Sequence, residues 1–248
     1  MRPLLAARVS AGSTPMISPI STLRRVAVCA LLLVIAGAAA AHGVAESDQE
    51  YLQQVSGPQL GPFMYLGAKH MVTGYDHLLF LFGVIFFLYR LRQVAAYVTM
   101  FAIGHSTTLI AGVLLGTNIS SHLVDAVIGL SIVYKALDNI RAFETWFAWR
   151  PEGHVAVLFF GLFHGFGLAT KLQQFGLKPD GLLVNLISFN IGVEIGQMLA
   201  LAAILIMMDY WRRTPSFERN AFRANVVLMT AGFLLTGYQL AGYFILER

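Results

Sequence analysis

Charged residues and cysteine are both scarce in this 248-residue chain. Only 12% of the residues are charged and 57% are hydrophobic, whereas a soluble domain has about 25% charged and about 45–50% apolar residues. The single cysteine, Cys29, lies in the N-terminal apolar stretch. A mature chain without that stretch has no disulfide, thiolate metal ligand or cysteine nucleophile. The phosphate-binding pattern G-x-x-x-x-G-K-[ST] is also absent, so we do not expect the chain itself to hydrolyse ATP.

The net charge of +4 does not indicate a nucleic-acid partner. The basic residues lie in short loops between apolar runs instead of gathering on one polar face. The composition instead predicts an all-α integral membrane protein whose main partner is the lipid bilayer.

The N-terminus has the pattern of a secretory signal peptide. Two arginines precede an apolar stretch, residues 26–41, that ends in alanines, which matches a positive region, an apolar core and an A-x-A-like cleavage site. We therefore expect residues 1–41 to be a cleaved signal peptide, with Met16 as an alternative start. An uncleaved first membrane anchor is the other interpretation, but the stretch is shorter than the about 20 residues of a span.

Cleavage after residue 41 would leave His42 at the mature N-terminus. A free amine and its own imidazole form a chelate for copper or nickel, and Glu46 and Asp48 follow closely. The simpler interpretation is an incidental residue after the cleavage site. Residues 42–61 are expected to form a short external segment.

Residues 62–248 are expected to form one transmembrane domain, a bundle of about six helices without internal repeats. The apolar runs lie at 63–89, 96–116, 122–140, 154–174, 182–208 and 223–245. Each is close to or longer than the about 20 residues that cross a bilayer.

The loop charges predict an orientation. Arginines are concentrated in three loops, residues 89–96, 140–154 and 208–223. The alternate loops, 116–122 and 174–182, hold a single lysine between them. By the positive-inside rule the first set is cytoplasmic. Both termini would then lie outside a multi-pass protein of the inner (plasma) membrane, in agreement with a cleaved signal.

Polar residues inside the apolar runs are the functional candidates, because an ionisable group in lipid is costly. They are His70, Asp76 and His77 in the first run, His105 in the second, His164 in the fourth, and Asn190 and Glu194 in the fifth. Residues 70 and 77 are about two helical turns apart and share a face. Asn190, Glu194 and Gln197 are spaced to line one stripe.

The depth of these residues allows them to form one cluster. His105, His164 and Glu194 lie near the middle of their runs at a rise of about 1.5 Å per residue, and the first run supplies ligands nearer the outside. Imidazoles and carboxylates suit nickel, zinc, copper or iron. The alternative is that each histidine is an interhelical hydrogen-bond partner. Glycines of the fourth and fifth runs would let helices approach closely, and they would bring His164 near Glu194 if these two helices pack there.

Five ordered motifs resemble the HupE/UreJ family, and its second branch most. They are His70-Met-Val-Thr-Gly-Tyr-Asp-His, Gly104-His-Ser-Thr-Thr-Leu, Leu130-Ser-Ile-Val-Tyr, Phe160-Gly-Leu-Phe-His-Gly-Phe-Gly and Phe189-Asn-Ile-Gly-Val-Glu-Ile-Gly-Gln. The resemblance covers roughly residues 63–245. It implies a nickel or cobalt permease that serves hydrogenase and urease maturation, with His70, Asp76 and His77 as the metal-binding signature. The remaining polar candidates match the family's other motif positions.

The first expectation is therefore a permease for a divalent transition metal, nickel or cobalt before zinc or copper, and not an enzyme. One alternative is an intramembrane zinc hydrolase assisted by Ser106 or Glu194, although no H-E-x-x-H pair is present. Another is an assembly factor for a metalloenzyme that binds metal and moves none. The oligomeric state is left open.

Overall fold

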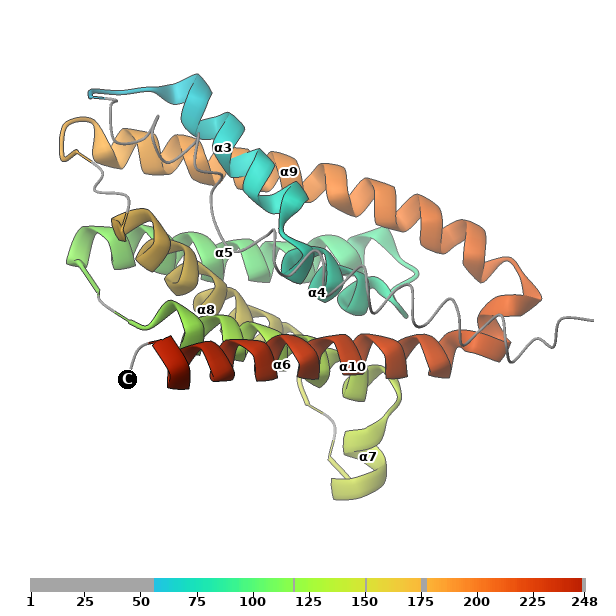
Figure 1. Ribbon diagram of the computed structural model, residues 1–248. Helices are drawn as coiled ribbons and strands as arrows, with labels where there is room; N and C mark the ends of the chain where they lie inside the picture. The colour runs from blue at the N-terminus through green and yellow to red at the C-terminus, as the bar shows by residue number, and fades with distance from the viewer. Residues whose placement is uncertain (1–55, 118, 150, 175–177, 247–248) are drawn as a thin grey trace, which may run out of the picture.

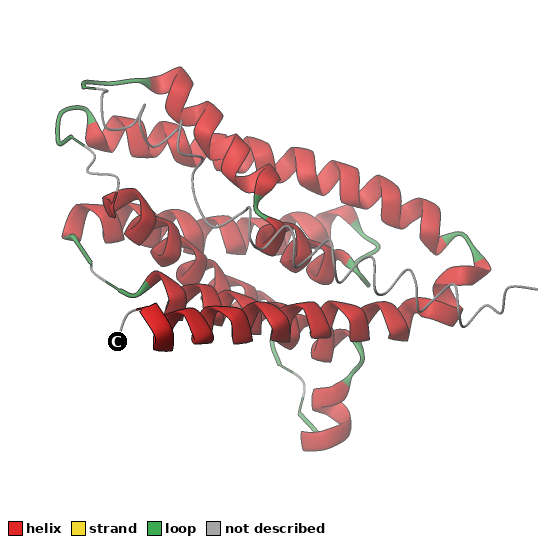
Figure 2. Cartoon of the chain, viewed as in Figure 1, coloured by secondary structure: helices red, strands yellow, loops and turns green. Residues whose placement is uncertain are grey.

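The computed structural model describes residues 56–117, 119–149, 151–174 and 178–246, and within these ranges every regular element is a helix (Figure 2). The expected signal peptide, His42 and most of the expected external segment lie outside the described residues. The helices are α3 (Leu60–Thr73), α4 (Tyr75–Ile85), α5 (Leu91–Leu115), α6 (Ser121–Asn139), α7 (Ala142–Phe147), α8 (Gly153–Gln174), α9 (Leu182–Arg212) and α10 (Pro215–Leu246).

The long helices form a bundle of three closely packed pairs. Helix α3 packs on α9, α5 on α8, and α6 on α10. In Figure 1 the α5–α8 pair lies between the other two, and the short helix α7 projects away from the bundle.

Four of the described helices, α5, α8, α9 and α10, are long and apolar enough to cross a membrane. The chain is therefore a multi-pass membrane protein, and these four match four of the six expected spans. The third expected span is a helix, α6, but Asp125, Lys135 and Asp138 make it less apolar. The first expected span differs more.

The expectation of one continuous helix over residues 63–89 is wrong, because the chain leaves helical geometry at Gly74. Its φ and ψ are −71° and 101°, and its N–H donates to the carbonyl of His70 to end α3. Helix α4 then starts in a new direction (Figure 1). A side chain at residue 74 would lie 2.7 Å from His77 Nδ1 and 3.0 Å from Asp76 Oδ1. Glycine therefore leaves the space in which these two side chains meet.

Glycines allow close helix approach, as the sequence predicts, but between other partners. A methyl group on Gly192 would overlap the carbonyl oxygen of Met64, and one on Gly196 would lie 2.6 Å from that of Ala68, so α9 packs on α3. Gly161 and Gly165 on α8 lie equally close to the α5 backbone. The condition under which these glycines would bring His164 near Glu194, packing of α8 on α9, is not met, because α8 packs on α5 and α9 on α3.

Polar side chains connect the helices within the apolar bundle. The Thr108 hydroxyl donates to the Leu162 carbonyl at 2.7 Å, and Ser188 donates to the Leu60 carbonyl at 2.5 Å. The Arg212 guanidinium donates to the carbonyl of Phe86, just beyond the end of α4, at 2.8 Å. Such bonds satisfy backbone groups that a broken helix would otherwise leave unpaired in lipid.

Candidate functional site

Histidines from four helices converge inside the bundle, with His77 at the centre. The ring centroid of His77 lies 5.0 Å from that of His70, 5.1 Å from that of His164 and 6.4 Å from that of His105. These residues come from α4, α3, α8 and α5 respectively. His77, His105 and His164 are buried, with 4%, 1% and 2% of their surface exposed. We refer to the four residues as the histidine cluster.

The break at Gly74 lets two neighbouring residues orient one ring. Asp76 Oδ1 lies 2.9 Å from His77 Nδ1 and also accepts the His77 backbone N–H at 2.9 Å. A carboxylate accepts only, so Nδ1 carries the proton and Nε2 keeps its lone pair. His77 Nε2 is buried and has no hydrogen-bond partner. This is the arrangement by which a carboxylate orients a metal-binding imidazole.

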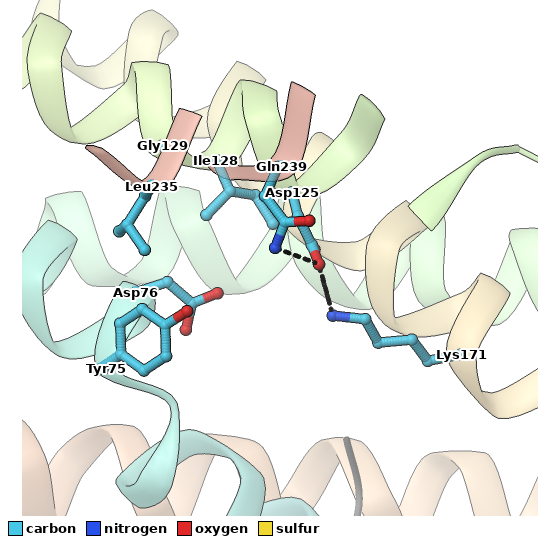
Figure 3. Close-up of a pocket in the computed structure, with 8 residues that line it drawn as sticks. All are labelled: Tyr75, Asp76, Asp125, Ile128, Gly129, Lys171, Leu235 and Gln239. Carbon is cyan, nitrogen blue, oxygen red and sulfur yellow. Dashed lines mark hydrogen bonds and ion pairs between the residues drawn. The ribbon is translucent and has the colours of Figure 1, made fainter. Parts of the chain in front are cut away.

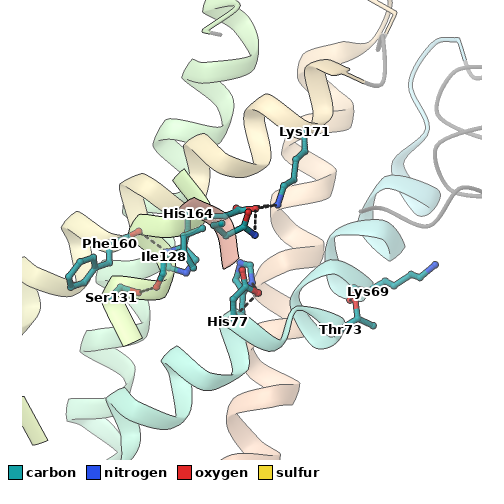
Figure 4. A network of polar contacts seen from close by, with 11 residues as sticks. Lys69, Thr73, His77, Ile128, Ser131, Phe160, His164 and Lys171 are labelled. Atoms are coloured by element: carbon teal, nitrogen blue, oxygen red, sulfur yellow. Dashed lines mark hydrogen bonds and ion pairs between the residues drawn. The ribbon is translucent and has the colours of Figure 1, made fainter. Parts of the chain in front are cut away.

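His164 is held in the same tautomer by the backbone. Its Nδ1–H donates to the Phe160 carbonyl one turn earlier at 2.8 Å (Figure 4), so its buried Nε2 is also a free acceptor. Neither nitrogen of His105 has a partner, and Asn190 donates its amide N–H to Leu186 but leaves Oδ1 unpaired. The described residues therefore hold several orphaned acceptors inside the bundle.

Unpaired buried polar atoms cost about 1–3 kcal/mol each, so a group of them marks a candidate binding site for a cation or another polar ligand. With metal–nitrogen bonds of about 2.0–2.1 Å at a tetrahedral angle, two imidazole centroids lie about 5 Å apart. The distances from His77 to His70 and to His164 fit this value. His105 would have to approach by about 1 Å. Among the described residues no group of three His, Cys, Asp or Glu is already arranged to hold a metal, so binding requires the cluster to contract.

Two phenylalanine rings pack against the cluster. The Phe101 ring is stacked on His105 at 5.9 Å and meets His164 edge-on at 4.9 Å. Phe80 lies 5.6 Å from His164. Apolar packing of this kind limits the orientations of the imidazole rings and strengthens polar interactions beside it.

Two hollows lie next to Asp76 and His77. The first has a volume of about 30 Å³ and is lined by Tyr75, Asp76, Asp125, Ile128, Gly129, Lys171, Leu235 and Gln239 (Figure 3); we call it the outer hollow, after the expected orientation. The second, of about 10 Å³, is lined mainly by apolar residues and contains His77 and Gln197. Its wall extends to Tyr97 and Val157, near the N-terminal ends of α5 and α8, whereas Lys171 of the first hollow lies near the C-terminal end of α8. Asp76 lines the first hollow and His77 the second.

The comparison with protein-family models shows which family the chain belongs to. A family model of the second branch, described as HupE / UreJ protein, matches residues 46–247. The chain belongs to the HupE/UreJ family. The matched range includes every described helix of this HupE/UreJ protein and all four residues of the histidine cluster. No curated protein and no solved structure matches the chain.

Glu194 of this HupE/UreJ protein lies apart from the histidine cluster. Its side chain is exposed on α9, among the exposed residues Ile191, Ile195 and Met198. Around the circumference of α9, Asn190 lies at the edge of the buried face. A helix turns about 100° per residue, so residue 194 lies about 40° beyond that edge. The predicted stripe of Asn190, Glu194 and Gln197 is thus divided: its first and last members are buried and Glu194 is not.

The remaining histidines of the described residues have other partners. His122 Nδ1 lies 2.8 Å from Gln239 Oε1. His154, outside the cluster, lies 2.9 Å from Glu152 Oε1. That contact, together with the Val155 N–H, lowers the pKa of the Glu152 carboxyl below its usual value.

The sequence analysis missed one pair of site residues. Lys171 on α8 and Asp125 on α6 form an ion pair of 2.9 Å at the outer hollow. The available signal was a lysine and an aspartate at similar depth in two apolar runs, where each charge needs a partner.

Proposed function

We propose that this HupE/UreJ protein is a permease for a divalent transition metal ion, nickel or cobalt first. The observation that carries the proposal is the set of buried imidazole nitrogens without partners around His77. Family membership supports the choice of metal. Neutral nitrogen ligands bind nickel, cobalt, zinc and copper better than magnesium or calcium, which prefer oxygen.

The ion would pass from one hollow to the other through the histidine cluster. Asp76 would meet it in the outer hollow, and His70, His77, His105 and His164 would replace its water. Asn190 Oδ1 is an additional acceptor. Conduction requires a site that binds well enough to admit an ion and loosely enough to release it. A cluster that must contract to complete its coordination suits transient binding.

The broken first helix supports transport over a purely structural role. Interrupted helices in membranes are tolerated where they line a cavity or a substrate path. We propose that α3 and α4 together make the first of six passes and that α6 makes the third. The arginine-containing loops would be cytoplasmic and both termini outside in the inner membrane. Residues 1–41 would be removed as a signal peptide, and His42 would offer a first metal contact.

Metal uptake into proteoliposomes tests the proposal. Wild type, His77→Ala and Glu194→Gln are compared for nickel, cobalt, zinc and copper. We expect uptake of nickel or cobalt by wild type and by Glu194→Gln, which changes an exposed carboxyl on α9, and uptake at the level of empty liposomes for His77→Ala. Size-exclusion profiles check that each variant is folded.

The same experiment separates the alternatives. Metal bound in stoichiometric amount by wild type but never moved across the bilayer would overturn the permease and favour a metalloenzyme assembly factor. Tightly held zinc together with hydrolysis of an added peptide or ester would favour a hydrolase.

A further inference from the structure

The outer hollow contains two carboxylates from separate helices. Asp76 comes from α4 and Asp125 from α6, and both line the same space (Figure 3). Paired carboxylates are the ligands that magnesium and calcium prefer. An entrance of this kind would fill with these abundant ions before a scarce transition metal reached the imidazoles.

Lys171 already forms an ion pair with one of the two carboxylates, that of Asp125. Its ammonium lies 2.9 Å and 3.2 Å from the two oxygens of Asp125, joining α8 to α6. The amide of Gln239 on α10 donates to the same Asp125 Oδ2 at 3.4 Å. Lys171 is two helical turns from His164 on α8, so its side chain reaches the hollow beside the cluster (Figure 4).

We propose that Lys171 is a selectivity residue at the mouth of the path to the histidine cluster. Its ammonium acts as a tethered cation that keeps magnesium and calcium from bridging Asp76 and Asp125. One uncompensated carboxylate, Asp76, then remains to attract any divalent ion, and the imidazoles beyond it make the choice of metal. The inference rests on the proposed function and adds the means by which oxygen-seeking ions are excluded.

Calcium binding to the purified full-length protein in nanodiscs tests the inference without any transport. Radioactive calcium is titrated against wild type, Lys171→Gln, Lys171→Arg and the double variant Asp125→Asn/Lys171→Gln. We expect Lys171→Gln to bind calcium about tenfold or more tightly than wild type, because the two carboxylates that line the outer hollow then have no ammonium beside them. Lys171→Arg keeps the charge and should resemble wild type.

The double variant distinguishes selectivity from a structural role of the ion pair. It lacks the contact between α6 and α8 but again leaves one uncompensated carboxylate. Weak, wild-type-like calcium binding by the double variant supports selectivity. Tight binding by the double variant, or no gain in Lys171→Gln, overturns the inference. If Lys171→Gln does not fold, calcium binding is measured for the single variant Asp125→Asn. The inference requires that this variant bind calcium more weakly than wild type.

Nickel uptake in the presence of magnesium relates the inference to transport. Magnesium should inhibit Lys171→Gln at about tenfold lower concentration than wild type. The two proposals can fail separately. If wild type moves no nickel but Lys171→Gln gains calcium binding, the proposed permease function is wrong and the proposed role of Lys171 stands. If nickel uptake is lost in His77→Ala but Lys171→Gln gains no calcium binding, the permease function stands and the proposed role of Lys171 is wrong.

Discussion

At the scale of single residues, the contact between Asp76 and His77 is the feature that prepares the cluster for a cation. The carboxylate fixes the proton on Nδ1 and leaves Nε2 without a partner, in a ring whose centroid lies 5.1 Å from that of His164 and 6.4 Å from that of His105. The spacing of residues 70 and 77 predicts that the two histidines share a helix face. Only the break at Gly74 explains how adjacent residues 76 and 77 act as a pair.

Replacing Asp76 by asparagine should weaken nickel binding by about 10–100-fold, the usual effect of losing the partner that orients a metal-binding histidine. An amide has similar size but carries no charge, and it can present an N–H to His77 Nδ1. Equilibrium dialysis with nickel measures the change in affinity. An unchanged affinity would mean that the carboxylate does not orient the ring.

Glu194 should react with the lipid-soluble reagent dicyclohexylcarbodiimide while nickel binding is unaffected. Its carboxyl is exposed on an apolar helix, where the reagent is concentrated. Mass spectrometry of the labelled protein locates the adduct, and Glu194→Gln is the control without a target. Protection of residue 194 by bound nickel would contradict its placement outside the cluster.

The histidine residues of the cluster could be predicted because polar groups in an apolar run are costly and therefore few. The position of Glu194 could not, because helical periodicity relates residues to one another and does not show which helix covers them. The ion pair of Lys171 and Asp125 was missed for the same reason. Its two members come from helices whose contact the sequence does not reveal.

At the scale of helices, hydropathy predicted a single first span because it does not detect backbone geometry. Residues 60–85 are apolar on both sides of Gly74, and only the dihedral angles at that residue separate α3 from α4. The other long spans agree with prediction because length and apolarity define them. Which helices pack together could not be predicted, because small residues permit close approach without specifying the partner helix.

Gly74→Ala should weaken nickel binding by more than about tenfold while helix content stays the same. The added methyl would lie 2.7 Å from His77 Nδ1, and alanine also favours a continuous helix by about 1 kcal/mol over glycine. Gly61→Ala on α3 is the matched control, because nothing lies within 4 Å of its added methyl. Equal affinity of the two variants would show that the break is not needed for the site.

Gly192→Leu should separate α3 from α9 and lower the stability of the protein by about 1–3 kcal/mol or more. The added side chain would collide with the backbone of Met64, whereas Gly237→Leu on α10 enters open space. Unfolding in detergent, followed by tryptophan fluorescence, compares the two variants. Similar midpoints would indicate that α3 and α9 are not tightly packed in the membrane.

At the scale of the whole molecule, the two hollows give the path a direction only if the ends of the bundle face known sides of the membrane. Loop charge predicts that Lys178 lies outside and that Glu218, in the first turn of α10, lies inside. Both side chains are exposed. Because the described part of the chain has no cysteine, single-cysteine variants can report this orientation cleanly once Cys29 is replaced by serine.

A membrane-impermeant maleimide should label Lys178→Cys in intact cells and Glu218→Cys only after the membrane is disrupted. The hollow that contains Lys171 would then open to the outside, and the tethered cation would screen ions before entry. The opposite labelling would place that hollow on the cytoplasmic side. Lys171 would in that case exclude cytoplasmic magnesium from a path leading outward, and the proposed uptake would become export through the same residues.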